Sequence, residues 1–154
     1  MLRYHPSVYY RETDHASLKS WPALLAAVTD IDGNITGIQR TWLDPQRSTK
    51  APLADPRRAL GHLLGNGVRF GKAVDILAAG EGVETMLALK SVLPSLPVIA
   101  ALSANHLAAL DLPPALRRPE TGRVVVSGDI EAAQRRGQIE GGEVVGRERG
   151  NDRQ

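Results

Sequence analysis

The chain has 154 residues, of which 42% are hydrophobic and 23% charged; this suits one ordinary domain or two small subdomains and excludes a fibre or a tail. The net charge is only +2, so charge alone does not establish a nucleic-acid partner. The absence of cysteine excludes disulfides, thiolate zinc sites, iron–sulfur clusters and cysteine nucleophiles. No segment approaches the roughly 20 apolar residues of a membrane helix, so we expect a cytoplasmic protein that does not enter a membrane.

The first 70 residues read as β-structure. Apolar-rich runs cover residues 22–28 and 35–43, and the Asp, Gly and Asn residues of segment 30–34 between them are typical of a hairpin turn. Three prolines then break residues 44–58 into a loop, because each one disfavours helix at the residue before it. This loop carries four basic residues, Arg47, Lys50, Arg57 and Arg58. We predict a β-rich subdomain over residues 1–70.

Strand-like and helix-like segments alternate between residues 71 and 135. In chain order they are a strand over 74–79, a helix over 83–93, a strand over 98–102, a short serine-capped helix over 103–110 and a strand over 123–126. This order predicts an α/β fold, a parallel sheet with right-handed crossovers and helices on both faces. Residues 136–154 are rich in glycine and charge, and we expect a disordered tail there.

Acidic residues follow the first and third predicted strands. Glu81 comes after the first strand, and Asp129 and Glu131 come after the third. Parallel sheets place their chemistry at the carboxyl ends of the strands, so these carboxylates are expected at one edge. Oxygen ligands of this kind suit Mg²⁺ or Mn²⁺, which implies phosphoryl transfer or phosphodiester cleavage. The alternative for Glu81 alone is a solvated acid at the start of a helix.

Three motifs in this order resemble the Toprim domain of bacterial primases, topoisomerases and related nucleases. They are Gly-Glu-Gly-Val-Glu-Thr at 80–85, Ala-Ala-Leu-Ser-Ala at 100–104 and Gly-Asp-Ile-Glu at 128–131. The upstream motifs at 33–37, 40–44, 50–52 and 60–61 look like the segment that precedes Toprim in replicative primases. There a hairpin, a lysine-containing loop and a following helix form the basic half of the catalytic cleft. The chain looks most like primase-like Toprim proteins of plasmids and phages, which are mobile elements.

The resemblance implies roles for six residues. Glu81, Asp129 and Glu131 match the catalytic, metal-binding acids, with Glu131 standing where the family has aspartate. Glu84 matches a further acid beside the metal. Lys50 matches a lysine near nucleotide or primer phosphates, and Arg40 is expected to steady phosphates with it. The alternatives are a helix-dipole role for Glu84 and ordinary surface positions for Lys50 and Arg40.

We therefore expect a small β-rich subdomain over 1–70, a Toprim-like domain over 71–135 and a tail over 136–154. The favoured function is primase-like, Mg²⁺-dependent nucleotidyl transfer on single-stranded DNA with nucleoside triphosphates, for DNA replication. A helicase or another replication protein is expected on a separate chain. The alternatives are a metal-dependent Toprim nuclease and a catalytically degenerate module that binds nucleic acid or a partner.

Overall fold

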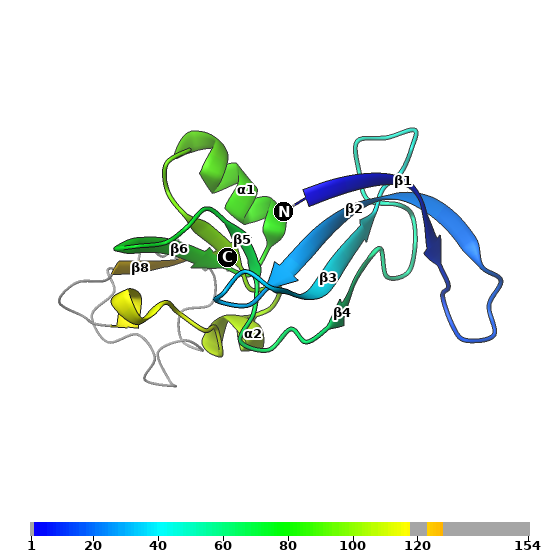
Figure 1. Cartoon of the computed structure of the whole chain (residues 1–154). Coiled ribbons are helices and arrows are strands. Elements are labelled where there is room, and N and C mark those ends of the chain that lie inside the picture. The colour runs from blue at the N-terminus through cyan, green and yellow to red at the C-terminus, as the bar shows by residue number, and fades with distance from the viewer. Residues whose placement is uncertain (1, 118–122, 128–154) are drawn as a thin grey trace, which may run out of the picture. The chain divides into compact units, whose positions relative to one another are not determined.

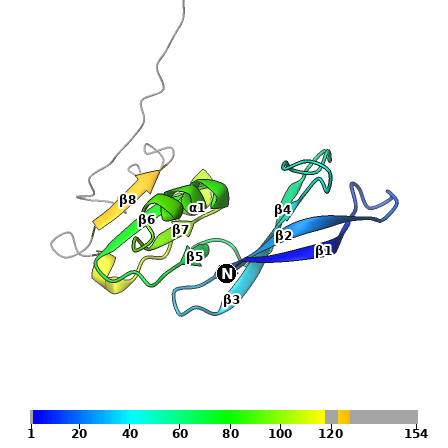
Figure 2. The same cartoon turned by 90° about the horizontal axis from the view of Figure 1, so that it is seen from above.

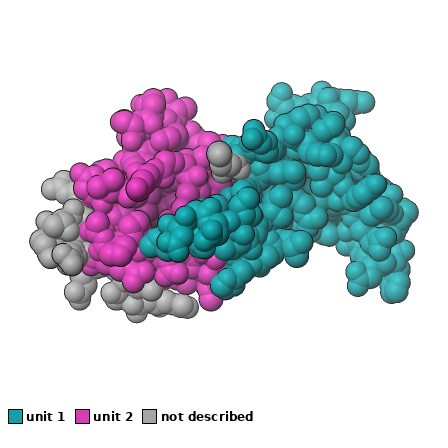
Figure 3. Space-filling model, viewed as in Figure 1, with its two compact units in different colours: residues 1–63 teal, residues 64–154 magenta. Residues whose placement is uncertain are grey.

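The computed structural model describes residues 2–117 and 123–127. The chain divides into two compact units, unit 1 over residues 1–63 and unit 2 over residues 64–154 (Figure 3). Unit 1 contains a four-stranded antiparallel sheet, and unit 2 contains a sheet with three parallel strands and helices on both faces. The predicted fold class, a β-rich part followed by a Toprim-like α/β part, is confirmed.

Unit 1 is an antiparallel meander in the order β1-β2-β3-β4 (Figure 1). Its strands are β1 (Leu2–Tyr10), β2 (Lys19–Thr29), β3 (Ile35–Trp42) and β4 (Arg57–Gly61). The strands predicted over 22–28 and 35–43 are confirmed as β2 and β3. The sequence analysis missed β1, most of whose residues are exposed, because its polar residues give no apolar run.

The predicted hairpin turn between β2 and β3 is confirmed and is organised by Asp30. Its carboxylate accepts hydrogen bonds from the backbone N–H groups of Asp32 and Asn34, each at 2.9 Å, and from the Asn34 side-chain amide at 3.0 Å. Gly33 has a φ of +89°, a conformation that glycine adopts without steric cost. The turn residues therefore form the hairpin through local hydrogen bonds.

The expectation of a loop through residue 58 was wrong, because Arg57–Gly61 form β4, and the motif at 60–61 is therefore part of a strand. Gly61 lies directly opposite Gly37 of β3 and has a φ of +108°, which excludes a right-handed helix there. A Cβ built on Gly61 would lie 2.5 Å from the Thr36 carbonyl oxygen and 2.6 Å from the Cα of Gly37. Two glycines thus allow the backbones of β3 and β4 to come close.

One face of this sheet buries the core of unit 1. Trp42 is 1% exposed and packs with Tyr10, Ala23 and Ala51. The rings of Tyr10 and Trp42 meet edge to face with centroids 5.0 Å apart, and the Trp42 indole N–H donates to the Val8 carbonyl at 3.2 Å. These contacts tie the end of β1 to the end of β3.

Unit 2 has the sheet order β5-β7-β6-β8, and Figure 2 shows β6 between β7 and β8. Its strands are β5 (Val68–Phe70), β6 (Ile76–Gly80), β7 (Val98–Ala100) and β8 (Arg123–Ser127), and its helices are α1 (Val83–Val92), α2 (Ala104–Ala108) and the 3-10 helix η1 (Pro114–Arg117). β6, β7 and β8 are parallel, as predicted. The three-residue strand β5, which was not predicted, pairs antiparallel with β7.

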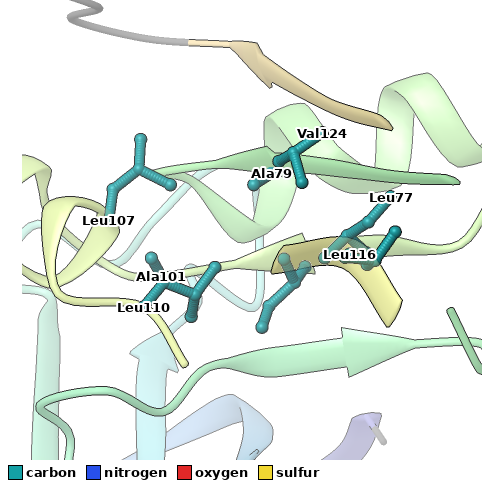
Figure 4. Packing of buried hydrophobic residues seen from close by; sticks show 8 residues of the cluster. Leu77, Ala79, Ala101, Leu107, Leu110, Leu116 and Val124 are labelled. Carbon is teal, nitrogen blue, oxygen red and sulfur yellow. The ribbon is translucent and has the colours of Figure 1, made fainter. Parts of the chain in front are cut away.

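Helices cover both faces of this sheet, with α1 on one side and α2 and η1 on the other (Figure 1). Leu77 and Ala79 of β6 face Leu107, Leu110 and Leu116 on the α2 side (Figure 4). Because side chains alternate along a strand, Ala78 between them faces the other side, where α1 contacts β6 and β7. The predicted serine cap of α2 is confirmed, since the Ser103 hydroxyl accepts from the His106 N–H at 3.3 Å.

No helix in the described part of the chain is long and apolar enough to cross a membrane. The predicted acids Asp129 and Glu131 lie outside the described residues, as does the predicted tail over 136–154.

Candidate functional site

Glu81 lies at the carboxyl end of β6, the central strand among the parallel three. Gly80 before it is buried, whereas Glu81 and Gly82 are half-buried. Helix α1 starts at Val83 with Gly82 as its N-cap residue, and the Gly82 carbonyl accepts from the Met86 N–H at 3.1 Å. The glutamate therefore sits in a short turn between a buried strand end and the first turn of a helix.

Glu84 lies beside this turn. It is exposed in the first turn of α1, and its Oε2 lies 3.9 Å from the position that a Cβ on Gly82 would occupy. The Glu84 carboxylate thus reaches back over Gly82 toward the turn that carries Glu81. The structure brings these two predicted acids onto the same short segment.

The turn at Glu81 is held by the loop that follows β7. The Ala101 N–H donates to the Gly80 carbonyl and the Leu102 N–H donates to the Glu81 carbonyl, both at 2.8 Å. Leu102 has a φ of +77°, in the left-handed region that side chains other than glycine rarely adopt. Strained backbone of this kind persists where the surrounding structure enforces it and is concentrated at functional sites. The 100–104 motif therefore contacts the 80–85 motif through two backbone hydrogen bonds.

β8 ends at the same edge of the sheet as β6. β6 and β8 pair in parallel, with Gly80 opposite Ser127 at their carboxyl ends. Glu81 follows Gly80 directly, and Asp129 and Glu131 follow Ser127 in the sequence but lie outside the described residues. Within the described residues, no three His, Cys, Asp or Glu side chains are grouped as a metal site would require.

The predicted phosphate-binding residues Lys50 and Arg40 belong to unit 1. Lys50 is exposed and forms an isolated antiparallel bridge with Leu43. Arg40 lies in the middle of β3, half-buried, with its guanidinium carbon 5.1 Å from the centroid of the Trp42 ring. The backbone of both residues is thus held by β-type pairing within unit 1.

The sequence analysis missed a cavity of about 380 Å³ in unit 1, lined in part by Tyr10, Arg40, Trp42 and Arg58. The sequence does place Arg40 and Trp42, two of these four lining residues, on one face of β3, because they are two positions apart on the strand. Tyr10 and Arg58 lie on β1 and β4, whose pairing with β2 and β3 the sequence pattern does not reveal.

Family comparisons cover most of the chain. A family described as a domain of unknown function, DUF7146, matches residues 1–70, and a Toprim domain family, Toprim_3, matches residues 76–152. No curated protein matches the chain. Toprim domains act on nucleic acids and typically bind Mg²⁺ through acidic residues, so the match indicates a metal-dependent function on nucleic acid. With the 80–85 and 100–104 motifs at one edge of the sheet and half of its length matched, the chain belongs to the Toprim domain family.

Proposed function

We propose that this Toprim protein is a primase-like nucleotidyltransferase that acts on single-stranded DNA with nucleoside triphosphates. The observation that carries the proposal is the parallel pairing of β6 and β8, which sets Gly80 opposite Ser127. Neighbouring strands lie about 4.8 Å apart, so the segments that leave these two strand ends start side by side. Glu81 begins one of these segments, and Asp129 and Glu131 follow in the other.

The donor set fits Mg²⁺. Glu81 and Glu84 offer carboxylate oxygens from one short segment, and hard cations of this kind prefer oxygen ligands. Glu81, Asp129 and Glu131, with Glu84 beside them, would hold the ion, which would neutralise charge on the phosphate under attack. Mn²⁺ has the same ligand preference and serves as a test ion.

The remaining roles fall to the backbone and to unit 1. The hydrogen bond from Leu102 fixes the peptide of Glu81, so that its side chain starts from a defined position. Gly80 and Gly82 carry no side chains, which leaves room for a bulky phosphate next to Glu81. Lys50 and Arg40 steady phosphates through their positive charges.

The test is incorporation of labelled nucleotide on a single-stranded DNA template with Mg²⁺ or Mn²⁺. Wild-type protein is expected to extend product, and Glu81→Gln to abolish it. Asp75→Asn is the matched control, because Asp75 is an exposed acid that precedes the other end of the same strand, and this variant should keep full activity. Loss of activity in both variants would contradict the assignment of Glu81.

The same reactions distinguish the two alternative functions. Metal-dependent shortening of the labelled strand without incorporation would replace the primase-like proposal with a Toprim nuclease. Binding of the strand with neither incorporation nor cleavage under either metal would identify a catalytically degenerate module. A helicase or replication protein on a separate chain is the partner that a primase-like role calls for.

A further inference from the structure

The cavity in unit 1 is built around two arginine–aromatic pairs on one face of the sheet. The guanidinium of Arg40 lies over the Trp42 ring at 5.1 Å, and that of Arg58 lies over the Tyr10 ring at 4.7 Å. Arg40 and Arg58 are directly opposite each other on β3 and β4, so both side chains leave the same face. Like charges in opposed positions repel, and an anion between or beside them relieves that repulsion.

Arg58 already uses most of its N–H donors to hold the cavity together. It forms an ion pair with Asp55 at 2.9 Å and donates to the Arg11 carbonyl at 2.7 Å, the Tyr10 hydroxyl at 3.2 Å and the Glu12 carbonyl at 3.4 Å. These bonds tie β4 to the end of β1 and to the loop after it. Arg58 therefore lines the cavity and stabilises its structure, and the charge of Arg58 is compensated by Asp55.

Arg40 is in the opposite situation. Its Nε is buried, and no hydrogen-bond acceptor contacts it in the described structure. No carboxylate of the described residues forms a salt bridge with Arg40, so its charge is not compensated as that of Arg58 is. A guanidinium offers several N–H donors in a planar fork, which matches the oxygens of a phosphate group. Arg40 thus lines the cavity with a guanidinium that no described carboxylate neutralises.

We propose that this cavity binds one phosphodiester group of a single-stranded nucleic acid, with Arg40 as the phosphate-binding residue. The volume of about 380 Å³ lies in the range of small-molecule sites and leaves space for part of a nucleoside beside the phosphate. The exposed acids Glu12 and Asp14 also line the cavity and disfavour ligands of high negative charge. A diester with one negative charge is therefore preferred over the polyanionic tail of a free nucleoside triphosphate.

This inference deepens the proposed function, since the strand held here is the one on which the Toprim domain acts. It is nevertheless tested separately, because binding in this cavity requires no metal. The assay is fluorescence anisotropy of labelled oligo-dT with the full chain in EDTA at several salt concentrations. Wild-type protein and Asp75→Asn are expected to bind alike in EDTA, whether or not nucleotidyl transfer is observed.

Arg40→Gln should weaken binding by about tenfold, the value of one charged hydrogen-bonded contact, and lower the slope of log K against log[salt] by about 0.7. Arg40→Lys keeps the charge but loses the fork, so affinity should fall while the salt slope is kept. Arg57→Gln is the matched control: Arg57 is the neighbour of Arg58 on β4, so its side chain leaves the opposite face of the sheet. An equal loss in Arg57→Gln would overturn the proposal in favour of diffuse charge.

A measurement on the wild-type protein covers the case in which a variant at Arg40 fails to fold. Phenylglyoxal modifies accessible arginines, and mass spectrometry identifies the modified positions. Oligo-dT should protect Arg40 from modification, whereas a nucleoside triphosphate at the same phosphate concentration should not. Binding of the oligonucleotide without protection of Arg40, or equal protection by the triphosphate, would contradict the proposal.

Discussion

The backbone N–H of Leu102 donates a hydrogen bond to the carbonyl oxygen of Glu81 at 2.8 Å, and Leu102 is the one non-glycine residue of the described chain at positive φ. The strained residue and the candidate catalytic acid are thus joined directly. Straightening the backbone at Leu102 would move the N–H that holds the Glu81 turn. The strained residue Leu102 therefore makes the hydrogen bond that fixes the position of the Glu81 backbone.

Two substitutions at Leu102 separate this strain from side-chain packing. Leu102→Ala removes the side chain but keeps the unfavourable φ of +77°, whereas Leu102→Gly removes both. Since the left-handed conformation costs about 1 to 2 kcal/mol, we expect the glycine variant to be more stable than the alanine variant by about 1 kcal/mol. Urea unfolding of the two proteins measures this difference. An alanine variant of equal or greater stability would show that Leu102 is unstrained in solution.

Metal binding should stabilise the folded protein. With free Mg²⁺ at a hundredfold excess over its Kd, the gain is about 2.7 kcal/mol, which thermal unfolding detects as a rise in Tm. Glu81→Gln should lose the rise because it removes a ligand charge, and Asp75→Asn should keep it. A wild-type Tm that does not respond to Mg²⁺ or Mn²⁺ would refute the proposed metal site.

Glu131 offers a test in which a conservative change increases activity. Its side chain is longer than that of the family's aspartate by one carbon–carbon bond, roughly 1.5 Å. A misplacement of about 1 Å can cost on the order of a hundredfold in rate. Glu131→Asp is therefore expected to raise metal-dependent turnover, and Asp129→Asn to remove it. Turnover that survives Asp129→Asn would place the metal elsewhere.

Gly61 and Gly33 form a matched pair for the packing of β3 against β4. Both have positive φ, +108° and +89°, but a Cβ on Gly33 meets nothing within 4 Å, whereas one on Gly61 meets backbone atoms at 2.5 and 2.6 Å. Gly33→Ala should cost about 1 kcal/mol from φ alone, and Gly61→Ala about 3 kcal/mol or more because crowding adds to it. The free energies of unfolding compare the two, and equal costs would mean that the strands separate easily.

The hairpin turn predicts a specific response to acid. The side-chain hydrogen bond from Asn34, helped by backbone N–H groups, holds the pKa of Asp30 below its ordinary value of 3.8. The stability that this turn contributes is therefore fully present above about pH 4 and is lost as the pH falls through the lowered pKa. Asn34→Ala should raise the pKa of Asp30 toward 3.8. An NMR titration of the Asp30 carboxyl carbon measures it, and an unchanged midpoint would assign the shift to the backbone donors alone.

Local signals in the sequence predicted most of the central elements. The Asp30 turn and the Ser103 cap are made by residues within a few positions of one another, so their chemistry is visible in the sequence. The strand β4 was not predicted, because it is short and mostly exposed. It is fixed by the pairing of Gly37 with Gly61 across a long loop. Strand pairing of this kind depends on distant residues, which a local pattern does not record.

The same distinction applies to the candidate sites. Glu81 was identified because an acid between glycines after an apolar strand is a local feature. The cavity was missed because its walls come from the separate strands that carry Tyr10, Trp42 and Arg58. The unsatisfied Nε of Arg40 is a property of the folded sheet, since burial and lack of a partner have no signature in the order of residues.

The two strand topologies also imply an order of events in folding. In unit 1 each strand pairs with its neighbour in the sequence, so no other strand or helix lies between the paired strands. In unit 2 the central strand β6 completes its pairing only when Ile76 meets Arg123, and α1, β7, α2 and η1 lie between them in the sequence. Closing long loops slows folding, and chains fold from the N-terminus during synthesis. The antiparallel meander is thus expected to form on the ribosome before the acidic edge of the Toprim sheet is assembled.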